Sequence, residues 1–221
     1  MALSRGRIAT IADLPATIPV FPLPGVLLLP RGRLPLNVFE PRYLAMIDDA
    51  LASSDRLIGM IQPTEPESEG RRPSLYDVGC TGRIVSMSET EDGRYLITLQ
   101  GICRFAIAKE IETDRGYRRI VPDFQRWAGD LQRDTSSIAD RPRLIGALKT
   151  YFRLNHIEAD WDGIEQTPDD KLLTTLAMVC PFEPTEKQAL LECATGAERA
   201  ATMTALLEMG AMSHCDDRAK H

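Results

Sequence analysis

The spacing of apolar residues changes once along this chain, near residue 124, and this change constrains the fold more than any other feature. Between Tyr95 and Ile107, apolar residues alternate with polar ones, as they do in half-buried strands. Between Leu144 and Phe152, they recur every three to four residues, as on one face of a helix. The sequence therefore predicts an α+β chain. Its expected parts are a β-rich unit over 1–124, a connector over 125–139, a helical unit over 140–215 and a tail over 216–221.

The clearest strand signal lies over residues 78–107. Glu91-Asp92-Gly93 predicts a hairpin turn, because Asp-Gly tolerates the positive φ angles of tight turns. The apolar residues that follow it fall on one face of a strand: Tyr95, Ile97, Leu99, Cys103, Phe105 and Ile107. Gly101 interrupts this face and predicts a bend or bulge in a strand that is otherwise too long. Long strands bent at a glycine are what a small closed barrel needs.

Shorter elements surround this hairpin. Leu34, Leu36 and Val38 alternate with polar positions, and Pro35 between them indicates a strand at a sheet edge. Residues 57–62 predict another strand, and the polar residues 64–74 predict a mobile loop.

Helix starts are marked by proline and by capping patterns. Pro41 predicts the start of a helix that reaches about Ala52, with the apolar stripe Leu44, Ile47 and Leu51. In the second half, threonine caps predict helices that begin near Thr167, Thr185 and Thr195. The last of these helices is expected to bury Ala200, Met203, Leu207 and Gly210.

Composition excludes some classes of partner. The formal net charge of -6 disfavours non-specific nucleic-acid binding. The most apolar stretch, residues 18–29, is too short to span a bilayer and is broken by prolines and a glycine. The five cysteines form no CxxC pair, and their odd number suits a reducing compartment. We therefore expect a cytoplasmic protein that does not enter a membrane.

Four segments carry a more specific signal when they are taken in order. They are Ile18–Leu23 with Val26–Pro30, Pro35–Leu44, Gly101–Ile107, and Glu186–Glu192 followed by Glu198-Arg199. Together they resemble the N-terminal domain family of the Lon proteases, as found in its stand-alone bacterial members. The resemblance implies a PUA-like β pseudo-barrel followed by a small α-helical bundle. It also implies a non-catalytic module that binds unfolded or extended polypeptide substrates.

The ATPase and peptidase of the Lon enzymes are not expected here. A Walker A loop needs a glycine-rich turn followed by Gly-Lys, and the sequence contains no Gly-Lys dipeptide. The Lon peptidase uses a serine and a lysine on a C-terminal domain, and this chain ends before that domain would begin. We therefore expect no enzyme activity and no cofactor.

Cysteine chemistry offers two alternatives. Cys103 and His156 could form a nucleophile and base, but Cys103 falls on the buried face of its strand. A zinc site could use Cys180, Cys193, His214 and Cys215, but their spacing matches no closed zinc motif. Core or surface cysteines are the expected outcome for both sets.

Binding of an unfolded chain needs exposed apolar surface, or a sheet edge that accepts a strand. The candidate residues lie in two segments near the start of the chain: Phe21, Leu23, Val26, Leu27, Leu28, Phe39 and Tyr43. A cleft between barrel and helical bundle is the other candidate location. Glu40 and Arg42 are expected to serve as scaffold at the start of a helix, and Arg104 as an exposed strand residue.

Two other functions stay open. One is an adaptor or regulator that binds a specific folded protein. The other is RNA binding through the PUA-like barrel, for which the basic residues Arg31, Arg33, Arg71, Arg72, Arg118 and Arg119 would supply phosphate contacts. The acidic net charge and the aromatic content of 6% argue against RNA.

Overall fold

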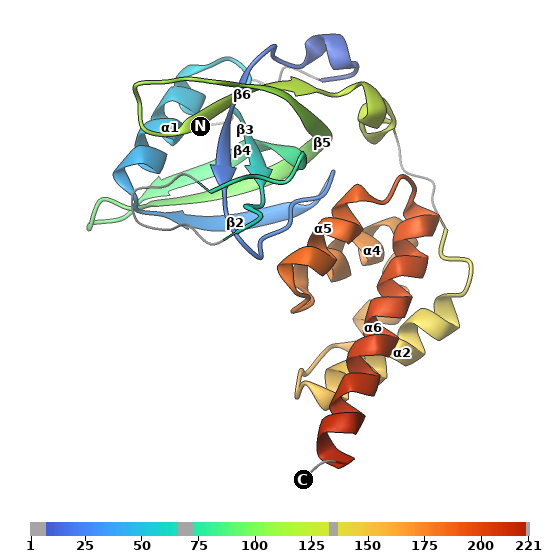
Figure 1. The fold of residues 1–221 in the computed structure, drawn as a ribbon. Coiled ribbons are helices and arrows are strands. Elements are labelled where there is room, and N and C mark those ends of the chain that lie inside the picture. Colours follow the sequence, from blue (N-terminus) through green and yellow to red (C-terminus); the bar gives the residue numbers. More distant parts are fainter. Residues whose placement is uncertain (1–7, 66–72, 133–136, 220–221) are drawn as a thin grey trace. The chain divides into compact units, whose positions relative to one another are not determined.

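The computed structural model divides into two compact units, residues 1–133 and 134–221, and each unit is described by itself. The structure describes residues 8–65, 73–132 and 137–219, with side chains up to residue 212. The first unit holds the strands and the second unit is helical (Figure 1). This arrangement confirms the α+β class that the change in apolar spacing predicts.

The first unit is a six-stranded sheet in the order β2-β5-β4-β3-β1-β6, and additional pairing between β5 and β6 closes it into a ring-like pseudo-barrel. Its elements in chain order are η1 (Ile11–Asp13), β1 (Ile18–Pro22), β2 (Arg33–Val38), α1 (Pro41–Ala52), β3 (Leu57–Ile61), β4 (Val78–Glu89), β5 (Tyr95–Ile111), β6 (Arg118–Asp123) and η2 (Gln125–Leu131). β1 is parallel to β3, and the other pairings are antiparallel. Within the described residues β2 pairs with β5 alone, which confirms the edge position that Pro35 indicates.

β5 bends where Gly101 predicts it. Thr81 lies opposite Cys103 and Gly82 lies opposite Gly101, so Ile102 is a bulge residue without a partner on β4. A Cβ atom at Gly101 would lie 2.0 Å from the carbonyl oxygen of Leu29. Gly101 therefore lets the backbone at Leu29 cross directly over β5, at the same place where the strand turns.

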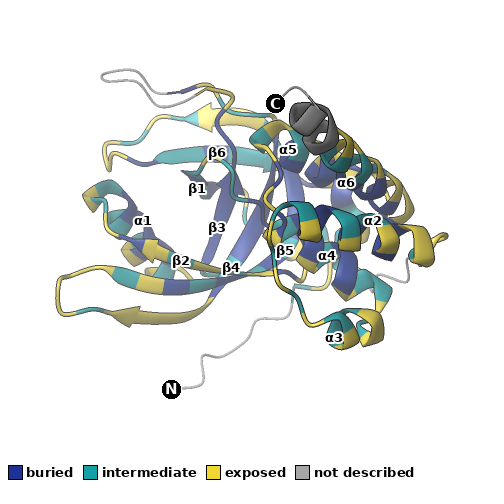
Figure 2. Cartoon of the chain, turned by 90° about the horizontal axis from the view of Figure 1, so that it is seen from below, coloured by how far each residue is buried: buried dark blue, intermediate teal, exposed yellow. Residues whose placement is uncertain are grey.

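The interior of the first unit is filled by large apolar side chains. Figure 2 shows β3 and much of β4 and β5 as buried. The largest fully buried side chains of this unit are Ile18, Leu28, Leu29, Met46, Ile47, Ile58, Ile97, Leu99, Phe105 and Ile120. Leu28 and Leu29 precede β2 rather than belonging to a strand, so this connecting segment is part of the barrel core.

α1 begins at Pro41 as predicted, but it buries a different stripe. Tyr43, Met46, Ile47 and Ala50 are buried, whereas Leu44 and Leu51 are half-buried, so the predicted stripe is wrong in phase. The Tyr43 ring packs against Phe21 of β1, with 4.2 Å between ring centroids. The buried face of α1 is thus displaced from the predicted stripe by about one residue, which corresponds to about 100°.

A 3-10 helix, η2, occupies the first part of the predicted connector, and the side chain of its Trp127 is buried. The same helix corrects the prediction that Arg104 is exposed. The Arg104 guanidinium donates to both carboxylate oxygens of Asp130, at 2.9 and 2.7 Å, and lies 3.9 Å from the centroid of the Trp127 ring. The Arg104 side chain is 5% exposed, so a buried ion pair fastens η2 to β5.

The second unit consists of α2 (Arg141–Leu154), α3 (Trp161–Gln166), α4 (Asp169–Val179), α5 (Pro184–Glu192) and α6 (Gly196–Ala219). The predicted apolar face of α2 is buried. Of the predicted face of α6, Ala200, Met203 and Leu207 are buried, whereas Gly210 is half-buried. α3 is short and has no apolar repeat, so no local sequence pattern predicts it. Asp169 at the start of α4 accepts a hydrogen bond from the N–H of Ile138 and pairs with Arg141.

The predicted helix caps are right at one helix and displaced at two. Thr195 caps α6, because its hydroxyl accepts the N–H of Glu198. Thr167 ends α3 instead of capping α4, and its hydroxyl donates to the carbonyl of Gly163. α5 begins at Pro184 after Glu183, whose N–H donates to the Glu186 carboxylate. Three residues after the predicted cap Thr185 stands Gln188, and three residues after the observed cap Glu183 stands Glu186. Either residue can satisfy the N–H of its own cap, so the pattern alone does not fix the first residue of the helix.

Candidate functional site

An opening remains in the pseudo-barrel between β1 and β2. β6 covers β1 only from Ile18 to Val20, and β2 pairs with β5 on its other side. The chain from Phe21 to Pro24 therefore faces β2 across a space that no described strand fills. We call this space the seam.

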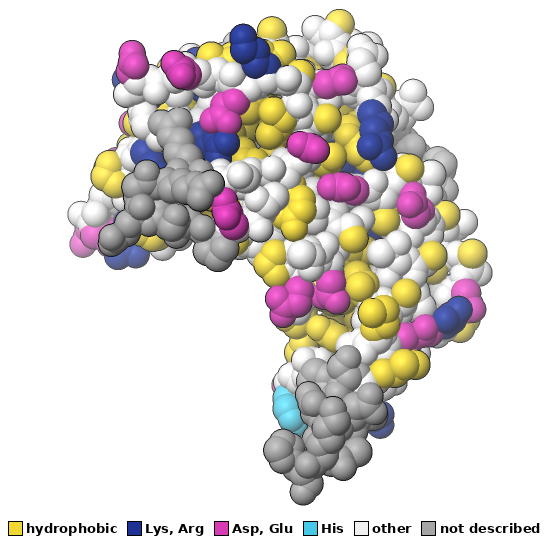
Figure 3. Space-filling view, viewed as in Figure 1, with side chains coloured by type: hydrophobic (Ala, Val, Ile, Leu, Met, Phe, Trp, Pro, Cys, Tyr) yellow, Lys and Arg dark blue, Asp and Glu magenta, His cyan; other side chains and the backbone are white. Residues whose placement is uncertain are grey.

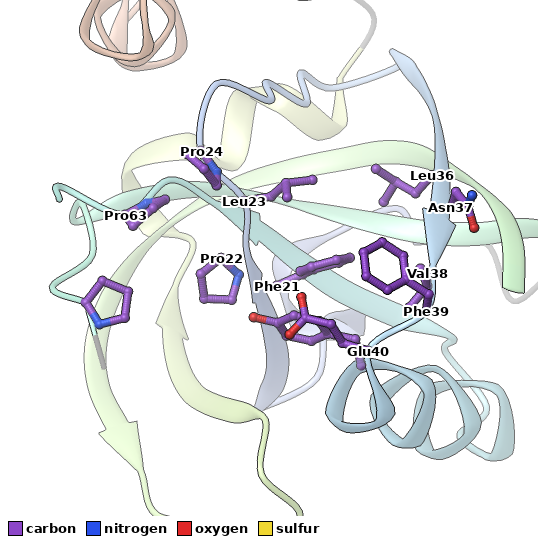
Figure 4. A pocket seen from close by; sticks show the side chains of 12 residues that line it. Phe21, Pro22, Leu23, Pro24, Leu36, Asn37, Val38, Phe39, Glu40 and Pro63 are labelled. Atoms are coloured by element: carbon purple, nitrogen blue, oxygen red, sulfur yellow. The ribbon is translucent and has the colours of Figure 1, made fainter. Parts of the chain in front are cut away.

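The seam contains a cavity of about 240 Å³. One wall comes from the end of β1, and the other comes from β2 and the residues that lead into α1. The lining residues are Phe21, Pro22, Leu23, Pro24, Leu36, Asn37, Val38, Phe39, Glu40, Tyr43, Pro63 and Pro73. Figure 4 shows Phe21 and Leu23 on one side and Leu36 and Phe39 on the other, with the Phe39 ring turned toward Phe21.

Aromatic rings form the floor and the rim of this cavity. Phe21 and Tyr43 are buried and packed against each other, so they are rigid parts of the floor. Phe39 is 62% exposed, and the Arg94 guanidinium lies 5.7 Å from the centroid of its ring. Phe39 is the most exposed large apolar side chain among the described residues of the first unit, and exposed apolar surface that continues into an apolar cavity marks an interaction site.

The charged groups at the seam neutralise each other. Arg42 and Glu40 form an ion pair with 2.8 Å between nitrogen and oxygen, and the Arg42 guanidinium lies 4.6 Å from the centroid of the Tyr43 ring. This agrees with the scaffold role expected for both residues at the start of α1. Among the described residues that line the cavity, Glu40 is the one charged residue, and most of the others are apolar or proline.

Prolines from separate parts of the sequence also gather here. Pro63 and Pro73 stand on either side of residues 66–72, the part of the predicted 64–74 loop that lies outside the described residues. Next to them, Thr64 donates its N–H to the Ser74 carbonyl at 2.9 Å. No local sequence pattern marks these prolines as lining residues, because their position depends on which strands are neighbours.

The candidate residues from the sequence separate into two groups. Phe21, Leu23, Phe39 and Tyr43 line the cavity. Val26 is half-buried outside it, and Leu27 and Leu28 are each 2% exposed within the barrel core. The structure thus brings together four of the candidates and adds Leu36 from the edge strand.

The cysteine alternatives gain no support from the geometry. Burial and the nearby Asp130 carboxylate raise the pKa of the Cys103 thiol to about 12, which keeps it protonated at neutral pH. His156 belongs to the other unit. Burial also raises the pKa of Cys180 to about 12. The described residues contain no group of three or more His, Cys, Asp or Glu placed to hold a metal, and the side chains of His214 and Cys215 lie outside them.

Several of the arginines considered for RNA are engaged within the protein. Arg118 pairs with Glu110 at 2.6 Å, Arg119 donates to the Thr17 hydroxyl, and Arg31 donates to the carbonyl of Asp130. Arg71 and Arg72 lie outside the described residues. On the face shown in Figure 3, acidic and basic side chains are interspersed rather than gathered into a basic patch.

Fold and seam together define a six-stranded ring-like pseudo-barrel followed by helices, with a cavity beside the free edge of β2. Residues 17–209 match the family model described as the ATP-dependent protease La (LON) substrate-binding domain. The chain therefore belongs to the LON substrate-binding domain family. No catalytic domain of the Lon enzymes is found within these 221 residues.

Similar proteins agree with this assignment. Lon protease 4 of Sorangium cellulosum is 30% identical over 174 residues, which cover 77% of this chain and 21% of that protein. Lon protease 2 of Thermus thermophilus is 26% identical over 207 residues, which cover 88% of this chain and 24% of that protein. The chain thus spans between a fifth and a quarter of the length of these relatives.

Solved structures share the fold. A Lon N-terminal domain protein from Xanthomonas campestris superimposes with a TM-score of 0.58 and 20% identity, over 86% of this chain and 97% of that one. The N-terminal domain of the Mycobacterium avium complex Lon protease gives the same TM-score with 18% identity and the same coverage. Among the described residues, no helix has the length and apolar character to cross a membrane.

Proposed function

We propose that this protein binds unfolded or extended polypeptide at the seam and catalyses no reaction itself. The observation that carries the proposal is Phe39, a largely exposed aromatic ring at the mouth of an apolar cavity. Unfolded chains expose apolar side chains that folded proteins bury, so an apolar cavity with an aromatic rim selects for them. The family description and the names of the relatives, which are Lon proteases, support a polypeptide as the class of ligand.

The buried aromatic residues of the floor act mainly by holding the cavity in shape. Phe21 and Tyr43 hold each other and the start of α1, so their loss would damage the fold as well as the cavity. Phe39 and Leu23 have more exposed surface and are the better contacts for a ligand. We assign Phe39 and Leu23 to ligand binding, and Phe21 and Tyr43 to the shape of the site.

The test is a direct binding measurement with purified protein and without ATP. The ligands are a model polypeptide that is kept unfolded by reduction and alkylation, the same polypeptide in its folded form, and a single-stranded RNA. Preference for the unfolded form supports the proposal. Equal binding of folded and unfolded forms contradicts it, and binding to neither form would favour the alternative of an adaptor for one specific folded protein.

A pair of variants locates the binding. Phe39→Ser removes the exposed ring, and we expect about a tenfold loss of affinity for the unfolded polypeptide with little change in stability. Val85→Ser is the control, because Val85 is also an exposed apolar residue of the first unit but does not line the cavity. Equal losses for both variants would mean that binding is not at the seam.

A further inference from the structure

The two walls of the seam differ in the hydrogen-bond donors that they offer. On the β1 wall, Leu23 donates its N–H to the Ile61 carbonyl at 3.0 Å. Phe21 belongs to β1, which pairs with β3, and four further residues of the lining, Pro22, Pro24, Pro63 and Pro73, have no N–H to donate. Fixed φ angles also make this wall rigid before any ligand arrives, which lowers the entropy cost of binding.

The β2 wall has backbone groups that point into the seam. On the β2 side of β5, Gly101 donates its N–H to the Gly32 carbonyl at 2.9 Å. On the β4 side, Thr90 donates its N–H to the Arg94 carbonyl, also at 2.9 Å. Both bonds indicate the same alternation. The backbone N–H and C=O groups of odd-numbered β5 residues point toward β2, and those of even-numbered residues point toward β4. In an antiparallel ladder this direction alternates along the strand.

The phase identifies which residues of β2 face away from β5. Leu34, Leu36 and Val38 are opposite Leu99, Ile97 and Tyr95, so their backbone groups point toward β5. The backbone groups of Arg33, Pro35 and Asn37 therefore point away from β5, toward the free edge of β2. Pro35 fits this phase, because a proline in a strand is placed with its missing N–H on the unpaired side.

Asn37 is the residue where this free edge reaches the cavity. Its N–H and C=O, with the C=O of Pro35 two residues earlier, form a donor and two acceptors spaced like the backbone of an extended strand. The cavity beside them has about 240 Å³, whereas an engineered cavity of about 150 Å³ holds a benzene molecule. It therefore has room for one large side chain, and that side chain should be uncharged because Arg42 already neutralises Glu40.

We propose that the seam binds one extended polypeptide strand, which pairs with the free edge of β2 at Asn37 and inserts one large apolar side chain into the cavity. This inference rests on the proposed function and specifies its ligand: an unfolded segment with a phenylalanine or leucine between residues that adopt the extended conformation. A helical ligand does not fit, because its backbone groups are already bonded internally.

The first experiment uses the wild-type protein and a nine-residue peptide with a central phenylalanine flanked by valine and threonine. Single N-methyl groups are placed at successive backbone positions of this peptide. An edge-bound strand uses the N–H of alternate residues, so methylation should reduce affinity by about tenfold at every second position near the phenylalanine and have little effect between them. Because the peptide and not the protein is altered, folding of a variant does not enter the result.

The second experiment changes the protein. Asn37→Pro removes the N–H that faces the seam, and its ring is compatible with an unpaired strand edge. Its affinity is compared with that of Asn37→Ala, which loses the same side chain but keeps the N–H, after thermal unfolding has shown that both variants fold. We expect the proline variant to bind the peptide about tenfold more weakly than the alanine variant.

The outcomes separate this inference from the proposed function. Alternating sensitivity to N-methylation, together with the proline effect, supports strand pairing. Equal affinity of all N-methylated peptides overturns strand pairing, while the proposed function stands because the peptide still binds. If neither the peptide nor the unfolded polypeptide binds to wild type, both proposals are wrong.

Discussion

At the scale of single residues, the Arg104–Asp130 pair is the clearest determinant of stability. The two side chains are 5% and 10% exposed, and Arg104 adds a stacking contact with Trp127. Arg104→Ala would leave the Asp130 carboxylate buried without its partner. We expect a loss of about 3–5 kcal/mol in the free energy of unfolding, measured by urea denaturation.

The control for this prediction is Arg115, which forms a similar pair in a different environment. Arg115 and Asp49 are also 2.7 Å apart, but their side chains are 56% and 38% exposed. Arg115→Ala should therefore cost less than about 1 kcal/mol. Equal losses for the two variants would mean that burial does not set the strength of these pairs.

The Cys103 thiol makes stability depend on pH in the alkaline range. Its pKa is raised from 9.0 to about 12 by burial and by the Asp130 carboxylate. Below the unfolded pKa the thiol is neutral in both states and the stabilising contribution is fully present. As the pH rises from 9.0 toward about 12, the unfolded thiol ionises first, so stability is lost. The measurement is the free energy of unfolding against pH, and Cys103→Ala should show a shallower fall than wild type.

At the scale of elements, the bulge in β5 depends on Gly101. A Cβ atom there would lie 2.0 Å from the Leu29 carbonyl oxygen, so Gly101→Ala must push the segment before β2 away from β5. We expect a destabilisation of about 3 kcal/mol or more, since a backbone atom has to move. Gly129→Ala in η2 is the matched control in the same unit, because nothing lies within 4 Å of a Cβ atom there. Thermal unfolding of both variants tests the prediction, and comparable midpoints would contradict it.

The strands β2 to β5 and most helices were predictable from sequence because their signals are local, whereas β6 has no clear alternation and was not predicted. Alternation from Tyr95 onward, with Asp-Gly before it, identified the β4–β5 hairpin, and Gly101 identified the bulge. η2 was missed, since its burial depends on Arg104 and Asp130, which are 26 residues apart. No local pattern shows that an arginine in a strand has a buried partner.

The candidate site was only partly predictable for the same reason. Residues 21–28 contain more apolar side chains than one barrel strand needs, but the sequence does not show which of them lie in the barrel core. Leu27 and Leu28 point into that core, whereas Leu23 lines the seam. The opposite wall comes from β2, whose distance from β1 depends on where β6 ends. Ring closure is a property of the whole sheet, so the cavity could not be deduced from any one segment.

At the scale of the whole molecule, the family match covers both units. Residues 17–209 include the pseudo-barrel and the helices as far as α6, so the helical unit belongs to the same family domain as the barrel. The seam nevertheless uses residues of the first unit alone. The strand-pairing proposal can therefore be argued from the barrel by itself.

The charge of the whole molecule gives the last prediction, which separates polypeptide from RNA. The net charge is -6, and the charged residues at the seam are already paired, so polypeptide binding there should change by less than about twofold when salt is raised fourfold. Suppose instead that Arg31, Arg33, Arg118 and Arg119 each neutralised one phosphate of a single strand. The same rise in salt would then weaken RNA binding about fiftyfold, because each contact releases bound counterions. Affinities for the unfolded polypeptide and for the RNA, measured at about 50 and about 200 mM salt, distinguish the two functions. A steep salt dependence for the polypeptide would mean that it binds to a charged surface and not to the seam.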